Sequence, residues 1–199
     1  EDGENMSFDI FKIILKTFSK KLEKDNYYVV LGGGEPTVHP DFWKMLNYSL
    51  SYNKVWLSTN GLIKEDALVL CELAKKNILN AVLSLDKWHT EIDQEVIDNF
   101  KFLTKEHKYS WGSDWKAGVA GDLRVVRVQN LIINGGRCKD GKDICPCQQV
   151  QIEPSGIMKF CGCEDSPVVG IIGDVEGGFF EEYKNIPWYK TCHKNWKSK

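Results

Sequence analysis

Polar and glycine-rich groups occur at three points in the first half of the chain, each directly after a short run of β-forming residues. They read Gly-Gly-Gly-Glu-Pro-Thr at residues 32–37, Ser-Thr-Asn-Gly at residues 58–61 and Ser-Leu-Asp-Lys-Trp-His at residues 84–89. Glycine lets a ligand approach the backbone closely, and carboxylate, hydroxyl and amide groups supply hydrogen bonds. These residue types predict a binding site for a polar small molecule.

The glycine run differs from two common nucleotide-binding loops. Thr37 occupies the place of the last glycine of a Rossmann fingerprint, and the Gly-Lys-Ser/Thr of a P-loop does not follow. For this segment taken alone, a tight turn without a ligand is the alternative interpretation.

Cysteines with metal-ligand spacing form a second candidate site in the last third of the chain. A Cys-x-Cys pair occurs twice there, formed by Cys145, Cys147, Cys161 and Cys163. Four converging thiolates suit an iron–sulfur cluster or zinc, and Cys192 or Cys138 could complete the site. Two disulfides are the alternative, which the odd total of seven cysteines and the lack of a secretory signal do not favour.

A predicted β-hairpin brings the two cysteine pairs together. Two β-forming runs flank the turn sequence Pro-Ser-Gly at residues 154–156. If Glu153 pairs with Ile157, Cys147 lies opposite Cys163, with the other two cysteines close by. A register error of one residue would still leave the four cysteines clustered.

Helices and strands alternate over the first two thirds of the chain, and this alternation positions the three polar groups. Apolar residues at helical spacing predict helices near residues 8–22, 40–50, 67–74 and 96–103. Ser7 is placed to cap the first helix, and Pro40 to open the second. β-forming runs predict strands at residues 27–31, 55–58, 81–85 and 124–133.

Such alternation predicts an α/β fold with a parallel sheet, whose strands collect ligands at their carboxyl ends. The visible strands are fewer than the eight of a closed barrel, so we expect a partial (βα) barrel whose first strand lies upstream. Near Gly135-Gly136 the composition shifts toward Gly, Cys, Asp and Lys, and the helical periodicity ends. We therefore expect two domains, residues 1–136 and a small cysteine-rich β-hairpin domain at residues 137–199.

Charge and hydropathy limit the partners. The chain has 26 basic and 28 acidic residues and a formal net charge of −2, which predicts no nucleic-acid or membrane partner. No apolar run approaches the roughly 18–20 residues that cross a bilayer, and no signal peptide is visible. The expected location is the reducing cytoplasm.

Three other reactive residues are assigned structural roles. Cys71 lies on the apolar stripe of a predicted helix, where a buried packing cysteine is expected. His39 and His89 follow the first and third polar groups and could reach the pocket, but capping or surface roles are favoured.

The ordered trio of motifs, within roughly residues 27–90, resembles the radical S-adenosylmethionine (SAM) family of iron–sulfur enzymes. The resemblance implies that Gly33, Gly34 and Glu35 hold the methionine amino group of SAM. It also implies contacts to the ribose and carboxylate of SAM from the next strand ends, with four candidates: Thr59, Asn60, Ser84 and Asp86. Ser84 and Asp86 are two residues apart and share one face of their strand.

The chain departs from this family in one respect. The family's defining motif, Cys-x3-Cys-x2-Cys, binds three irons of a [4Fe–4S] cluster and leaves the fourth iron for SAM. No cysteine triplet in this chain has that spacing. In the family the motif precedes a helix like the one predicted near Phe8, so we expect it upstream of Glu1. Loss of the cluster in this lineage is the alternative, and without the motif the chain alone is expected to be inactive.

The resemblance implies reductive cleavage of SAM to a 5′-deoxyadenosyl radical, which modifies or oxidises a substrate. The implied substrate is a small molecule or a peptide, and the implied electron donor is a protein such as flavodoxin or ferredoxin. The cysteine-rich tail resembles the auxiliary iron–sulfur domains called twitch or SPASM, and Gly136-Arg137-Cys138 resembles the segment that joins core to tail there. Two alternatives remain open: a non-catalytic SAM-fold binding protein, and a small-molecule-binding α/β domain with a structural zinc site in its tail.

Overall fold

The computed structural model describes residues 4–25, 28–85, 89, 91–106, 118–120, 125–128, 131–134, 150–159 and 168–172. Contacts divide the chain into two compact units, of which the first is Ser19–Asp122 together with Glu1. The second unit combines Asp2–Phe18 with Leu123–Lys199. The domain boundary predicted near Gly135-Gly136 lies outside the described residues and stays a prediction.

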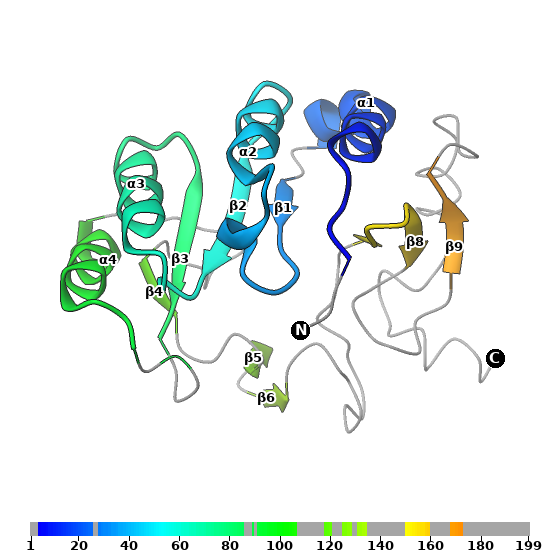
Figure 1. Ribbon diagram of the computed structural model, residues 1–199. Coiled ribbons are helices and arrows are strands. Elements are labelled where there is room, and N and C mark those ends of the chain that lie inside the picture. The colour runs from blue at the N-terminus through cyan, green and yellow to red at the C-terminus, as the bar shows by residue number, and fades with distance from the viewer. Residues whose placement is uncertain are drawn as a thin grey trace. The chain divides into compact units, whose positions relative to one another are not determined.

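The first unit is built on a parallel sheet in which the strand order follows the chain order (Figure 1). Its four strands are β1 (Val29–Leu31), β2 (Val55–Thr59), β3 (Asn80–Ser84) and β4 (Gly118–Ala120). The register pairs Leu31 with Leu57, Thr59 with Leu83, and Ser84 with Ala120. This confirms the predicted α/β class with a parallel sheet, whereas the described residues do not show a barrel.

Helices α2 (Phe42–Leu50), α3 (Lys64–Lys75) and α4 (Gln94–Glu106) connect the consecutive strands. Pro40 was expected at the first helical position, but α2 begins at Phe42 after Asp41. The proline that does occupy the first turn of a helix is Pro36, in the short 3-10 helix η1 (Pro36–Val38). The fixed φ of proline suits both kinds of helix start. Strand β4 lies in a Trp- and Gly-rich stretch for which the sequence pattern assigns no element.

The core of the first unit lies between the sheet and these helices. In β2, the buried residues Val55, Leu57 and Thr59 alternate with half-buried neighbours, as the two-residue period of a strand requires. Strand β3 is buried along its whole length. Among the residues with no exposed surface on α3 and α4 are Leu70, Val96, Phe100 and Leu103. Each large side chain buried in this way contributes about 1.5–3 kcal/mol to stability.

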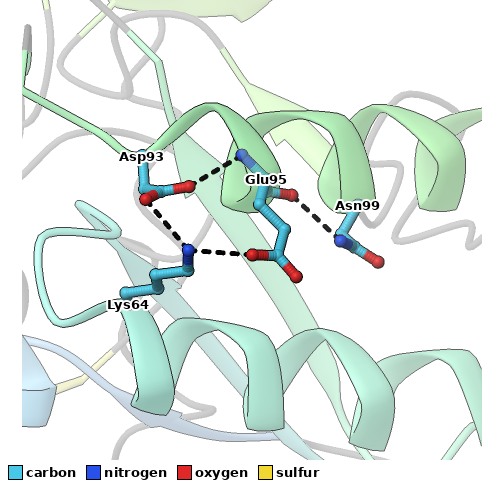
Figure 2. A network of polar contacts seen from close by, with 4 residues as sticks. All are labelled: Lys64, Asp93, Glu95 and Asn99. Carbon is cyan, nitrogen blue, oxygen red and sulfur yellow. Dashed lines mark hydrogen bonds and ion pairs between the residues drawn. The ribbon is translucent and has the colours of Figure 1, made fainter.

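A polar network on the surface joins the start of α3 to the start of α4 (Figure 2). Lys64 Nζ lies 3.0 Å from Asp93 Oδ2 and 2.8 Å from Glu95 Oε2. Asp93 Oδ1 accepts a hydrogen bond of 2.8 Å from the backbone N–H of Glu95, so Asp93 caps α4. The hydrogen bonds to Glu95 and Asp93 raise the pKa of Lys64, and the bonds from Lys64 and the Glu95 backbone lower the pKa of Asp93.

Helix α1 (Phe8–Asp25) begins as predicted. Ser7 caps it: the Ser7 carbonyl accepts from the Phe11 N–H at 3.0 Å, and Ser7 Oγ accepts from the Ile10 N–H at 3.2 Å. No helix among the described residues is both long and apolar enough to cross a membrane.

The second unit contains two antiparallel sheets. Strands β5 (Val125–Val128) and β6 (Leu131–Asn134) pair with each other, so the segment predicted as one β-rich run contains two antiparallel strands. Strands β7 (Gln151–Ile152), β8 (Ile157–Lys159) and β9 (Val168–Ile171) form the other sheet.

The β7–β8 hairpin has the predicted turn and register. Ile152 pairs with Met158, and the Glu153 N–H donates to the Ile157 carbonyl at 2.9 Å. The loop between them is Pro-Ser-Gly, and Gly156 has a φ of +85°. A three-residue hairpin loop needs a left-handed residue at its end, which explains the glycine.

Candidate functional site

The carboxyl ends of the four parallel strands lie at one edge of the sheet, and the three polar groups follow three of these ends. The strands end at Leu31, Thr59, Ser84 and Ala120. The predicted SAM-binding residues at this edge are Gly33, Gly34, Glu35, Thr59, Asn60 and Ser84. Asp86 lies outside the described residues, so its assignment stays a prediction. The topology therefore gathers most of the candidate residues where parallel sheets bind ligands.

The glycine loop after β1 presents accessible backbone. Gly32, Gly33 and Gly34 are all exposed. Gly33 has a φ of +132°, which L-residues rarely adopt, so glycine is required there by conformation. A Cβ at Gly32 or Gly33 would meet no atom within 4 Å. The loop can therefore offer backbone N–H and carbonyl groups to a ligand without steric obstruction.

Glu35, which ends this loop, is bonded to the end of the neighbouring strand. Its Oε1 accepts from Thr37 Oγ1 at 2.7 Å, from the Thr37 N–H at 3.2 Å and from Thr59 Oγ1 at 2.9 Å. Its Oε2 accepts from the Asn60 N–H at 2.5 Å. The carboxylate thus joins the loop after β1 to the carboxyl end of β2, although Glu35 and Thr59 are 24 residues apart in the sequence.

Thr59 and Asn60 also bond within the loop after β2. Thr59 is only 2% exposed, and its Oγ1 accepts from the Gly61 N–H at 3.0 Å. Asn60 Oδ1 accepts from the Leu62 N–H at 3.0 Å, a local turn that asparagine commonly makes. The two side chains therefore shape the loop as well as bordering the candidate site.

Gly61 closes this loop against the core. Its φ is +72°, and a Cβ there would lie 2.6 Å from Leu83 Cδ1. Such a Cβ would also lie 3.1 Å from Ile92 Cγ2 and 3.3 Å from Val96 Cγ1. Both the backbone and the packing require glycine at this position.

Thr37 is a residue of the site that sequence reasoning did not single out. It is 8% exposed and gives two hydrogen bonds to Glu35 Oε1. Glu35 acts as the cap of η1 through the Thr37 N–H. Only Pro36 carried a signal for this, because proline in a first-turn position is the pattern of a helix start, whereas glutamate is not a preferred cap residue.

The remaining reactive residues have structural surroundings. His39 is the C-cap residue of η1 through its backbone N–H, and its Nδ1 accepts from the Asp41 N–H at 3.0 Å, so the side chain makes a local structural contact. Cys71 is fully buried on α3, as expected, and burial raises the pKa of its thiol to about 11. Ser84 is buried at the end of β3, and His89 is half-buried beyond it.

The predicted metal ligands lie outside the described residues, so their assignment stays a prediction. They are Cys145, Cys147, Cys161, Cys163 and Cys192. Within the part of the chain that the structure describes, no group of three or more His, Cys, Asp or Glu side chains is arranged to hold a metal ion.

The structure defines an α/β protein, and the candidate residues lie at the carboxyl edge of its parallel sheet. An anchored carboxylate beside open glycine backbone suits a ligand that carries an amino group and further polar groups.

Comparison with known proteins gives one set of relatives. The chain is 38% identical over 71 residues to "Mycofactocin maturase MftC" of Mycobacterium ulcerans (strain Agy99), which is 35% of this chain and 19% of that protein. Proteins of the same name from Mycobacterium tuberculosis (strain CDC 1551 / Oshkosh) and Mycolicibacterium smegmatis are each 37% identical over 71 residues, 35% of this chain and 18% of theirs. The match thus spans about a fifth of the length of these curated relatives. No family model matches the chain, and no solved structure matches it.

Proposed function

We propose that this chain is the SAM-binding part of a radical SAM enzyme that modifies or oxidises its substrate. The observation that carries the proposal is the Glu35 carboxylate, which is bonded to Thr37 in η1 and to the carboxyl end of β2, beside an exposed glycine loop. The partial similarity to mycofactocin maturases supports it independently of this geometry.

The residues at the sheet edge fit the chemistry of SAM. A carboxylate has about four acceptor positions, and a hydrogen-bonding cation such as an ammonium group is its natural partner. The glycine loop adds backbone groups that a ligand can reach. When bound beside a [4Fe–4S] cluster, SAM supplies a 5′-deoxyadenosyl radical as the oxidant of an unreactive C–H bond. The part of this chain is to bind and orient SAM through Gly33, Gly34, Glu35, Asn60, Ser84 and Asp86.

A partial barrel is part of the proposal. Among the described strands, β1 is an edge strand that pairs with β2 alone, and Val30 within it is 40% exposed. An additional strand upstream would pair with this edge and extend the sheet toward a barrel. The Cys-x3-Cys-x2-Cys motif would follow that strand.

The tail is proposed to hold an auxiliary iron–sulfur cluster, with zinc as the alternative metal. The β7–β8 register supports this proposal, because it has the same pairing that would bring Cys147 opposite Cys163 if it continued beyond the described strands. Such a cluster could anchor the substrate or accept an electron from it.

The substrate class is proposed by analogy. The relatives are named as maturases, which favours a peptide or another precursor molecule over a free metabolite. A flavodoxin- or ferredoxin-like protein would supply the electron that SAM cleavage consumes.

The first test is to read the coding sequence immediately upstream of Glu1. A Cys-x3-Cys-x2-Cys motif is expected there, and its absence would favour a non-catalytic SAM-fold binding protein. The protein with this segment would then be reconstituted anaerobically with iron and sulfide and treated with dithionite and SAM. Formation of 5′-deoxyadenosine and methionine is the expected result, and SAM that stays intact in a fully loaded protein would contradict the proposal.

A second measurement identifies which metal the tail binds. Iron, acid-labile sulfide and zinc would be measured in anaerobically purified protein. Iron and sulfide that remain after the upstream motif has been mutated would support an auxiliary cluster. Zinc with little sulfide would favour a structural zinc site.

A further inference from the structure

The two oxygens of the Glu35 carboxylate have different surroundings. Oε1 accepts three hydrogen bonds, two from Thr37 and one from Thr59. Oε2 accepts one, from the backbone N–H of Asn60. Each carboxylate oxygen has two lone pairs, so the donors within the protein saturate Oε1, and Oε2 keeps acceptor capacity for a ligand.

The hydroxyl groups that bond to Oε1 have no proton left to donate to a ligand, and both residues are almost fully buried. Thr59 is 2% exposed, and its Oγ1 gives its proton to Glu35 and accepts from the Gly61 N–H. Thr37 is 8% exposed, and its hydroxyl also donates to Glu35. Each hydroxyl has one proton to give, and in both residues Glu35 receives it.

We propose that Thr37 and Thr59 are positioning residues, which hold Oε1 inside the protein and thereby turn Oε2 toward the amino group of SAM. This inference rests on the proposed function. It changes the role first expected for Thr59 from a direct contact with SAM to an indirect one through Glu35.

The same bonds limit the motion of the carboxylate before the ligand binds. Glu35 is half-buried, and its carboxylate is held by Thr37 in η1, by Thr59 at the end of β2 and by Asn60 directly after β2. A free glutamate side chain would lose rotamer entropy on binding a ligand, whereas this one has lost it on folding. Removing one hydroxyl should therefore weaken the affinity for the amino group without removing any atom that contacts SAM.

The test compares isosteric and conservative variants at each position. Thr59→Val and Thr37→Val keep the shape but lose the hydroxyl, whereas Thr59→Ser and Thr37→Ser keep the hydroxyl. Binding of SAM, and of its analogue that lacks the amino group, would be measured by calorimetry on the full chain. We expect each valine variant to bind SAM about tenfold more weakly, as for loss of one hydrogen bond to a charged group, and each serine variant to bind within about threefold of wild type.

Two readouts distinguish positioning from general damage. The valine variants should bind the analogue without the amino group as tightly as wild type does. In addition, Thr59→Val should have little further effect on SAM affinity in a Glu35→Gln background, because the residue then has no carboxylate to position. Ser49→Ala is the matched control: Ser49 is fully buried, and its hydroxyl donates to the Met45 carbonyl within α2 at 2.8 Å, so SAM affinity should not change.

The outcomes separate the two proposals. Wild-type protein that binds neither SAM nor the analogue would overturn the proposed function, and this inference with it. Wild-type protein that binds SAM while Thr59→Val binds equally well would leave the proposed function standing and overturn the positioning role. A Thr59→Val variant that loses affinity for both ligands alike, with an unchanged thermal midpoint, would return Thr59 to a direct contact and also overturn it.

Discussion

Replacing Gly61 with alanine tests whether the loop after β2 is fixed by its backbone, by its packing, or by both. The φ of Gly61 is +72°, and a left-handed backbone costs an L-residue about 1–2 kcal/mol. A Cβ would also lie 2.6 Å from Leu83 Cδ1, and Leu83 is a fully buried residue of strand β3. Overpacking of a core costs about 1–3 kcal/mol, because the neighbours must leave their preferred rotamers.

The two costs together predict that Gly61→Ala lowers the free energy of unfolding by about 2–4 kcal/mol, after a small gain from the stiffer unfolded chain is subtracted. Urea unfolding of the full chain, followed by circular dichroism and tryptophan fluorescence, would measure this change. If the slope of the unfolding free energy against urea concentration is the same in both proteins, unfolding exposes the same amount of surface in both.

Two other glycines of the site provide graded controls. Gly33→Ala meets no atom within 4 Å but has a φ of +132°, so it should cost only the backbone strain, about 1–3 kcal/mol. Gly32→Ala has open space and no such φ, so it should change stability by less than about 0.5 kcal/mol. Gly61→Ala with wild-type stability would refute the reasoning, and a Gly33→Ala variant less stable than Gly61→Ala would refute the part assigned to packing.

Further predictions concern three other residues of the fold, Cys71, Lys64 and Gly156. Burial raises the pKa of Cys71 to about 11, so mass spectrometry should find Cys71 unmodified by iodoacetamide at pH 8 until the chain unfolds. The raised pKa also means that the folded state keeps a proton that the unfolded state loses, so stability should fall between pH 9 and 11. If Cys71→Ala shows the same slope there, Cys71 is not its cause. Lys64→Met should destabilise the protein only slightly in thermal unfolding, and added salt should remove the difference, because the ion pairs with Asp93 and Glu95 are exposed; a large loss that salt does not change would contradict this. Gly156→Ala, with a φ of +85° and a Cβ 3.5 Å from Ile172 Cβ, should lower stability by about 1–2 kcal/mol in urea, and no loss would mean that the turn adapts.

The polar network between α3 and α4 should also make stability depend on pH in the acidic range. Because the pKa of Asp93 is lowered in the folded protein, its contribution to stability is present above the unfolded pKa and is lost as pH falls through the folded value. The salt dependence of Lys64→Met should therefore weaken in acid, when Asp93 is protonated.

The sequence alone determined the features that depend on short-range patterns. Apolar periodicity and the alternation of elements predicted the α/β class and the positions of most helices and strands. The turn sequence Pro-Ser-Gly predicted the β7–β8 hairpin, and the pairing of Glu153 with Ile157 considered for it is the register that the structure has. The buried state of Cys71 followed from its place on an apolar helix face.

Strand β4 and the strand pair β5–β6 could not be predicted in this way. β4 is a three-residue strand, Gly118–Ala120, which has too few residues to show a period. The segment at residues 124–133 was predicted as one β-rich run, because Gln129-Asn130, which separates Val128 from Leu131, is not one of the strong turn dipeptides.

Only the tertiary structure decided how the candidate site is held together. Glu35 and Thr59 are 24 residues apart, and no local pattern states that the carboxylate of one accepts a hydrogen bond from the other. That contact exists because β1 and β2 pair in parallel with Leu31 beside Leu57, which brings the loop after one strand next to the end of the other. Sequence could identify the polar residues of both loops, but their division into ligand-facing and positioning groups depends on strand register and burial, which are properties of the folded chain.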